Sequence, residues 1–127
     1  MMTSESSDVI YVRELRVGAV IGVYEWEQRI KQTICLDLEM AADIRKAAAS
    51  DAIEDTLNYK VVAERVSGYV EESRFNLIET LAERVCAILL EEFRIPWAKV
   101  TVSKPGAAQG SREVGVVIER GNRARES

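Results

Sequence analysis

The sequence predicts an α+β domain in which two antiparallel helices cover one face of a four-stranded antiparallel sheet. Two strand-like segments come first: residues 9–20 are rich in β-branched side chains, and residues 33–40 alternate between apolar and polar. Two segments with apolar residues at helical spacing follow, and two shorter strand-like segments come last. The predicted element order is therefore strand–strand–helix–helix–strand–strand, or ββααββ.

Alternation of apolar and polar residues predicts the strands. Residues 9–20 form a long first strand, with a bulge expected near Gly18. In residues 33–40 every second side chain is apolar, which predicts one buried face. That set consists of Ile34, Leu36, Leu38 and Met40. These two segments should pair as a hairpin, and residues 98–103 and 114–120 supply the last two strands.

Capping residues and apolar stripes predict the helices. Asn58 is a favourable N-cap for a helix that runs to about Ser73. A second helix is expected to begin with Asn76 as its cap, and Glu79 three residues later resembles a capping box. The buried stripe of this helix is Ile78, Leu81, Ala82, Val85, Ile88 and Leu89. Pro96 ends the helical region before the third predicted strand.

Composition indicates one folded domain without a membrane or nucleic-acid partner. The chain has 127 residues, of which 47% are hydrophobic, and a net charge of −4. No apolar run approaches the roughly 18 residues of a membrane span, and the polar start does not resemble a signal peptide. The domain has no dense cluster of lysine and arginine. We expect a cytoplasmic protein with a flexible arm at 1–8, a single domain at 9–120 and a flexible tail at 121–127.

The residue types available limit the chemistry. The chain has no histidine, which removes Ser-His and Cys-His catalysis and the usual zinc sites. Its two cysteines, Cys35 and Cys86, lie in apolar segments far apart, so buried thiols are expected rather than a disulfide or a metal pair. Any acid–base chemistry must then come from Glu, Asp, Lys or Tyr.

The segment 21–27 carries more chemistry than a hairpin connection needs. Gly22 allows the backbone to turn, and Tyr24 and Trp26 place two aromatic rings beside acidic residues such as Glu27. Loops of this kind often carry function. An aromatic anchor that closes the hairpin, with its acids in water, explains the same residues.

Four polar side chains at the ends of predicted elements are candidates for a site: Glu27, Tyr59, Glu79 and Lys104. Each also has an ordinary structural explanation. Glu27 can be a solvated loop acid, Tyr59 can pack on a helix start, and Glu79 can cap its helix. Lys104 can be a charged strand end. Taken singly, each residue favours the structural explanation.

Several separated segments, in the same order, resemble the dihydroneopterin aldolase family of bacterial folate synthesis. They are residues 21–27, 50–59, 74–79, 103–107 and 114–120. The resemblance covers nearly the whole chain. It implies the tunnelling fold (T-fold), in which the sheets of neighbouring subunits join into a barrel. It also implies a homo-oligomer, commonly an octamer of two stacked tetrameric rings with sites between subunits.

The resemblance assigns substrate-binding roles. Glu79 would accept hydrogen bonds from the amino group and the ring N–H of a pterin, a pair of donors that suits a carboxylate. Backbone groups around Leu77 and Ile78 would help to hold the ring. Tyr59 would come from the neighbouring subunit.

The resemblance also assigns a reaction and its catalytic residues. The substrate 7,8-dihydroneopterin would be cleaved by a retro-aldol step to 6-hydroxymethyl-7,8-dihydropterin and glycolaldehyde. Lys104 would be the main acid–base group, Glu27 would orient it and a substrate hydroxyl, and Tyr59 would deliver a proton to the intermediate. The ring C=N bond would accept the electrons, so no cofactor, metal or Schiff base is implied.

Three alternatives remain at this point. The aldolase could also epimerise dihydroneopterin at C2′ to dihydromonapterin, by reversing the cleavage on the other face. The close relative dihydroneopterin triphosphate epimerase shares the fold. A non-catalytic pterin- or purine-binding oligomer would keep Glu79 but would not need Glu27, Tyr59 and Lys104 together.

Overall fold

A computed structural model describes residues 7–106 and 110–123 of the chain. Most of the predicted arm and tail, and residues 107–109 between the last two predicted strands, lie outside the described residues. The division into arm, domain and tail therefore stays a prediction. Within the described part, no helix has the length and apolar character needed to span a membrane.

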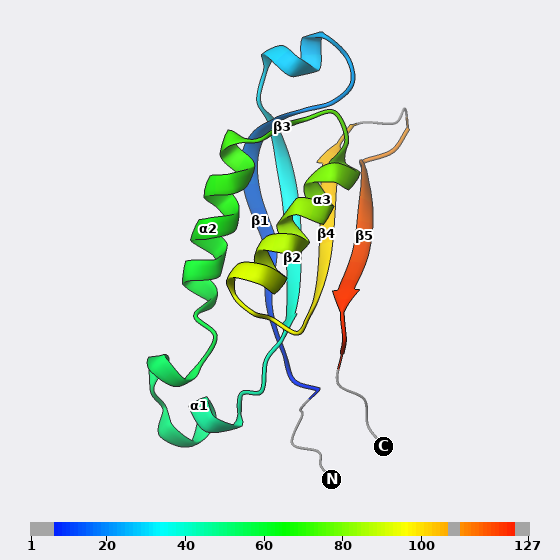
Figure 1. Ribbon diagram of the computed structural model, residues 1–127. Helices are drawn as coiled ribbons and strands as arrows, with labels where there is room; N and C mark the ends of the chain where they lie inside the picture. Colours follow the sequence, from blue (N-terminus) through cyan, green and yellow to red (C-terminus); the bar gives the residue numbers. More distant parts are fainter. Residues whose placement is uncertain (1–6, 107–109, 124–127) are drawn as a thin grey trace.

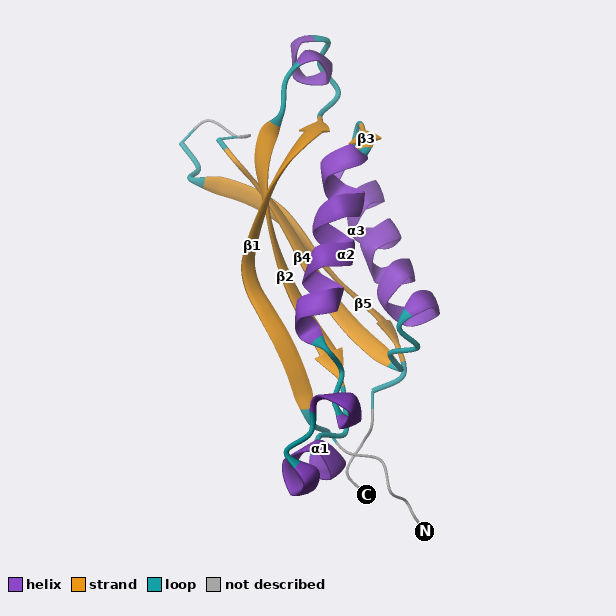
Figure 2. Ribbon diagram, turned by 90° about the vertical axis from the view of Figure 1, so that its left-hand side faces the viewer, coloured by secondary structure: helices purple, strands orange, loops and turns teal. Residues whose placement is uncertain are grey.

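Two helices lie side by side on one face of a curled sheet (Figures 1 and 2). The helices are α2 (Tyr59–Glu72) and α3 (Ile78–Ala87), and α3 continues into a π-helical turn, Ile88–Glu92. The long strands are β1 (Val9–Ile21), β2 (Gln32–Ala41), β4 (Trp97–Pro105) and β5 (Glu113–Gly121). Neighbouring long strands are antiparallel. The predicted α+β class is confirmed.

The prediction of four strands was wrong, because the sheet has a fifth strand and the order β3-β1-β2-β4-β5. Strand β3 is Arg74–Phe75, between the two long helices, and it pairs in parallel with the end of β1. A short helix α1 (Arg45–Ser50) and a 3-10 turn (Ile53–Asp55) also precede α2. Two paired residues are too few to show any periodicity in a sequence, which is why only a helix break was expected there.

The bulge in β1 lies elsewhere than predicted. Gly18 pairs regularly with Thr33, whereas the register shifts between Val12 and Leu15. Glu14 lies at this shift with a φ of 55°, and its N–H donates to Asp37 Oδ1 at 2.7 Å. A side-chain acceptor on the neighbouring strand thus satisfies the backbone donor that the bulge takes out of the ladder.

One predicted helix cap is confirmed and one was wrong. The side chain of Asn58 accepts hydrogen bonds from the backbone N–H groups of the first turn of α2. Helix α3 instead begins at Ile78, with Leu77 as an N-cap that makes no side-chain hydrogen bond. Pairing of β3 with β1 keeps the chain extended before Leu77, so Asn76 cannot form the expected capping box with Glu79.

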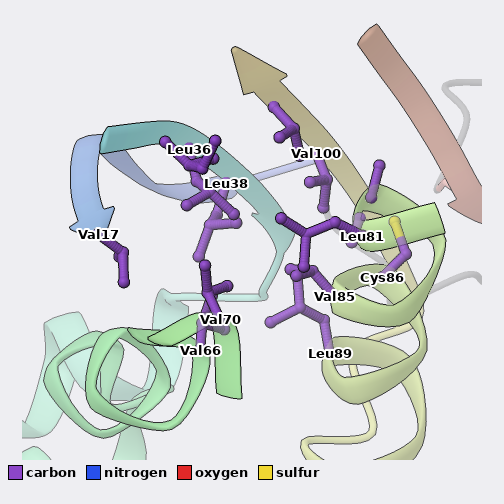
Figure 3. Packing of buried hydrophobic residues seen from close by; sticks show 14 of the residues in the cluster. Val17, Leu36, Leu38, Val66, Val70, Leu81, Val85, Cys86, Leu89 and Val100 are labelled. Atoms are coloured by element: carbon purple, nitrogen blue, oxygen red, sulfur yellow. The ribbon is translucent and has the colours of Figure 1, made fainter. Parts of the chain in front are cut away.

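The core lies between the sheet and the two helices (Figure 3). The alternating side chains of β2 predicted to be buried are fully so, and valines of α2 pack in the same cluster. Of the predicted stripe, Leu81, Ala82, Val85 and Leu89 belong to this cluster, whereas Ile78 is only half-buried. On β4 the side chains of Ala98, Val100 and Val102 occupy the same buried face. Truncating a buried leucine in such a core typically costs about 2–5 kcal/mol.

The two cysteines differ in their surroundings. Cys86 is buried in the core, as predicted, and burial raises the pKa of its thiol to about 11. Cys35 is only half-buried, so the prediction of a buried thiol was wrong there. Its position alternates with the core-facing residues of β2, and this places it on the face of the sheet opposite the core. Both thiols are free.

Candidate active site

A pocket of about 430 Å³ opens at one end of the sheet, where three chain segments meet. The loop after β1, the start of α3 and the end of β4 form its walls, and Figure 1 shows them together at the upper end of the molecule. Glu27, Glu79 and Lys104 all line this pocket. Three of the four candidate side chains, far apart in sequence, are therefore brought together.

The loop after β1 is shaped around the carboxylate of Glu27. Gly22 has a φ of +134°, and a Cβ atom built there would lie 2.2 Å from the Glu27 carboxyl carbon. Only glycine provides both the backbone conformation and the space. The chain then enters a 3-10 turn, Trp26–Arg29, which turns Glu27 inward. This residue is only 4% exposed, so it is not the solvated loop acid of the structural explanation.

Glu27 and Lys104 form a buried ion pair. The distance from Lys104 Nζ to Glu27 Oε2 is 2.5 Å, and the two side chains are 13% and 6% exposed respectively. Glu27 also accepts from the backbone N–H of Tyr24 at 3.3 Å and from Gln32 Nε2 at 3.2 Å. The hydrogen bond from Lys104 lowers the pKa of Glu27 most, and burial partly opposes this. Glu27 is therefore a carboxylate at neutral pH.

Strand β4 places Lys104 at the rim of the core. Its side chain follows Val100 and Val102 on the same face of the strand, since alternate residues share a face. The apolar row ends there, and the amine reaches the pocket instead of the helices. A charged strand end in water would not be buried in this way.

The start of α3 supplies a different kind of group. Glu79 lies in the first turn of the helix, where the helix dipole favours an anion. Leu77 and Ile78 beside it also line the pocket. Among the described residues Glu79 has no hydrogen-bond or ion-pair partner. Its carboxylate is therefore free to accept two N–H donors of a ligand.

Tyr59 lies away from the pocket within one chain. It is the first residue of α2 and is 57% exposed. Figure 1 shows this helix beginning toward the end of the molecule opposite the pocket. The aromatic residues Tyr24 and Trp26 do line the pocket, but both are largely exposed to solvent. A single chain thus provides the pocket without Tyr59.

Gln32 is a pocket residue that the sequence interpretation missed. It is the first residue of β2 and lies two positions before Ile34, on the core-facing side. The signal was present, because a polar residue extends an otherwise apolar row. Lys104 extends the corresponding row of β4 in the same way.

The fold and the pocket together define a class of protein: a small α+β domain with a pocket of small-molecule size beside a buried ion pair. Comparison with known proteins narrows the class. The family model for dihydroneopterin aldolase (FolB) matches residues 10–119. The chain belongs to the dihydroneopterin aldolase family.

Individual relatives agree with this assignment. The chain is 48% identical over 120 residues to dihydroneopterin aldolase of Escherichia coli K12, covering 94% of this chain and 98% of the relative. It is 44% identical over 114 residues to the Haemophilus influenzae protein of the same name, covering 90% and 97%. A crystal structure of the E. coli aldolase in complex with neopterin superposes with a TM-score of 0.87 at 48% identity, covering 90% and 99%.

Proposed function

We propose that this protein is a dihydroneopterin aldolase, a carbon–carbon lyase of folate synthesis, and that the pocket is its active site. The observation that carries the proposal is the buried Glu27–Lys104 pair, which shares one pocket with the unpartnered carboxylate of Glu79. A ligand held by Glu79 would lie next to a proton donor and a proton acceptor. Membership of the aldolase family and the neopterin complex of the E. coli relative support a pterin as that ligand.

Glu79 holds the substrate in this proposal. Its two oxygens accept from the amino group and the ring N–H of 7,8-dihydroneopterin, in the bidentate geometry that a carboxylate prefers. Backbone groups of Leu77 and Ile78 complete that side of the pocket. The trihydroxypropyl side chain of the pterin then points toward Lys104 and Glu27.

The cleavage breaks the bond between C1′ and C2′ of that side chain. The C2′ hydroxyl loses its proton as glycolaldehyde forms, and the bonding electrons move into the ring C=N bond while the ring nitrogen gains a proton. Lys104 exchanges these protons directly or through water, and Glu27 keeps the lysine in place. Protonation of C1′ and loss of the proton from the ring nitrogen restore the ring C=N bond and give 6-hydroxymethyl-7,8-dihydropterin.

The reaction in this proposal needs neither a metal ion nor a Schiff base. The ring C=N bond itself accepts the electrons, which a metal ion or an iminium would otherwise stabilise. The amine of Lys104 is held against the Glu27 carboxylate, and in this proposal it exchanges protons instead of attacking a carbonyl carbon. Borohydride treatment with substrate should therefore leave activity intact, and so should a metal chelator.

The complete site lies between subunits in this proposal. Tyr59 is exposed and distant from its own pocket, so a neighbouring chain must supply it as the residue that protonates the intermediate. Strand β5 is an open sheet edge, and β1 is paired on its outer side only at Val20 and Ile21. Open edges favour pairing with further copies. An octamer of two stacked rings is expected, and size determination in solution tests it.

Product analysis tests the proposed function directly. Purified protein is incubated with 7,8-dihydroneopterin and a metal chelator, and the pterins and glycolaldehyde are measured. Formation of 6-hydroxymethyl-7,8-dihydropterin with an equal amount of glycolaldehyde is the expected result. Formation of the epimer alone would replace the aldolase by an epimerase, with the triphosphate as the next substrate to test. Binding without either product would indicate a pterin-binding protein.

A further inference from the structure

The amide of Gln32 is held in one orientation by two acceptors. Its Nε2 donates to the backbone carbonyl of Ile21 at 2.9 Å and to Glu27 Oε2 at 3.2 Å. Both partners only accept hydrogen bonds, so the NH₂ group must face them and the amide oxygen must face away. The amide uses both of its N–H groups in this arrangement.

The backbone around Gln32 is fixed by the sheet. Gln32 pairs with Ala19 of β1, and its side chain is half-buried at the rim of the core. The carbonyl of Ile21 that it contacts is at the end of the same strand β1. Gln32 is therefore a rigid donor rather than a mobile surface amide.

The carboxylate oxygen that Gln32 contacts is the one that binds the lysine. Glu27 Oε2 accepts from both Gln32 Nε2 and Lys104 Nζ, while Oε1 accepts from the N–H of Tyr24. These three donors determine the rotation of the carboxylate. Without Gln32, Oε2 would keep only its lysine partner, and the plane of the carboxylate would be less restricted.

We propose that Gln32 is a positioning residue that holds Glu27 as a carboxylate with Oε2 directed at Lys104. This role rests on the proposed function, in which the pair handles protons during cleavage. Gln32 acts through Glu27 and needs no contact with the substrate. A hydrogen bond to the charged form favours that form, so Gln32 extends the working range of the site toward acid.

Other charged groups around Glu27 do not replace this contact. Glu25 and Arg29 pair with each other on the same turn, and Arg74 of β3 donates to a backbone carbonyl of that turn. Glu79 faces the pocket from α3. Among the described residues, Lys104 is the only charged group that contacts the Glu27 carboxylate.

The test compares two glutamines of the same loop region. Gln32→Met removes both N–H donors with little change in shape. The control is Gln28→Met, because the Gln28 side chain donates to the carbonyls of Gly22 at 2.5 Å and Phe75 at 3.4 Å and makes no hydrogen bond to the Glu27 carboxylate. Both variants lose backbone-carbonyl contacts, but only one loses a contact to the carboxylate.

The pH profile of kcat is the first measurement. In Gln32→Met the acid limb of the kcat profile should move to higher pH by about one unit. This corresponds to an increase of about tenfold in the proton affinity of Glu27. Loss of one hydrogen bond to a charged group has an effect of about this size. KM should change little, because Glu79 is untouched. Gln28→Met should keep the wild-type acid limb. An unshifted limb in Gln32→Met, or an equal shift in both variants, would overturn the proposal.

A second measurement does not depend on activity. Carbon NMR titration of the Glu27 carboxyl should show the same upward shift of its midpoint in Gln32→Met alone. Gln32→Glu keeps the side-chain shape and should raise the midpoint further, since a second carboxylate opposes ionisation of the first. If the wild-type protein cleaves no dihydroneopterin but the midpoint shifts, the proposed function fails while the positioning role of Gln32 remains. If the wild-type protein cleaves dihydroneopterin but neither Gln32→Met nor Gln32→Glu shifts the titration midpoint of Glu27, only the positioning role fails.

Discussion

Replacing Lys104 by methionine should destabilise the protein in a way that depends on pH. The substitution keeps most of the apolar stem but leaves the Glu27 carboxylate buried without its cation. Removing one partner of a buried ion pair typically costs about 3–5 kcal/mol. Because Glu27 keeps its hydrogen bonds from Gln32 and from the N–H of Tyr24, we expect the lower end, about 3 kcal/mol at neutral pH.

The pH dependence follows from the direction of the pKa shift. The pKa of Glu27 is lowered in the folded protein, so the stability it contributes is fully present above its ordinary value of 4.5. That stability is lost as the pH falls through the lower, folded value. The difference between wild type and Lys104→Met should therefore shrink as the pH falls below 4.5. It should be smallest below the lowered pKa of Glu27 in the folded wild type, where both proteins carry a neutral carboxyl.

Urea unfolding at a fixed protein concentration, at neutral and acid pH, measures this difference. Lys99→Met is the matched control, since Lys99 lies on the same strand but alternates onto the opposite face of the sheet. The control should lose less than about 1 kcal/mol at either pH, because Lys99 is only half-buried and forms no ion pair among the described residues. The reasoning would be refuted if Lys104→Met lowered the free energy of unfolding by less than about 1 kcal/mol at neutral pH. It would also be refuted if a large loss were the same at neutral and acid pH.

Three further substitutions test other parts of the site. Gly22→Ala should abolish most activity and lower the melting temperature. A Cβ at this position would lie 2.2 Å from the Glu27 carboxylate, and the backbone φ is positive. Normal activity and a normal melting temperature would contradict this. Glu79→Ala should weaken binding of a pterin product by at least about 2 kcal/mol, measured by calorimetry, and unchanged affinity would leave it as a helix-terminus acid only. Tyr59→Phe and Glu79→Ala proteins, each inactive, should regain activity when refolded together, and failure to do so argues against a site shared between chains.

Much of the fold was predictable because the sheet is built on strict alternation. The row Ile34 to Met40 and the stripes of the two helices each bury one face, and periodicity reports such faces directly. Strand β3 and the bulge at Glu14 were not predictable in this way. Both depend on contacts made across the sheet, with β1 in one case and with Asp37 in the other.

The candidate site was only partly accessible from the residues themselves. Position at the ends of predicted elements pointed to Glu27, Glu79 and Lys104, but taken singly each favoured a structural explanation. The family resemblance assigned them to one site, and the structure places all three in one pocket. Burial of Glu27 depends on the positive φ of Gly22 and on the space left by its missing side chain. Apolar periodicity in a sequence does not indicate either feature. Gln32 was missed because the second strand was taken to begin one residue later, and its polar side chain was not set against the apolar row that it extends.

The most direct test of the central claim separates turnover from binding in the Lys104→Met protein. Glycolaldehyde release from 7,8-dihydroneopterin and the affinity for 6-hydroxymethyl-7,8-dihydropterin are measured with the same preparation, beside wild type and Lys99→Met. The account predicts a fall in kcat of about 10²–10⁴-fold, typical for loss of a positioned acid–base group, with product affinity close to wild type. Turnover that survives largely intact would contradict the role of the Glu27–Lys104 pair in the reaction.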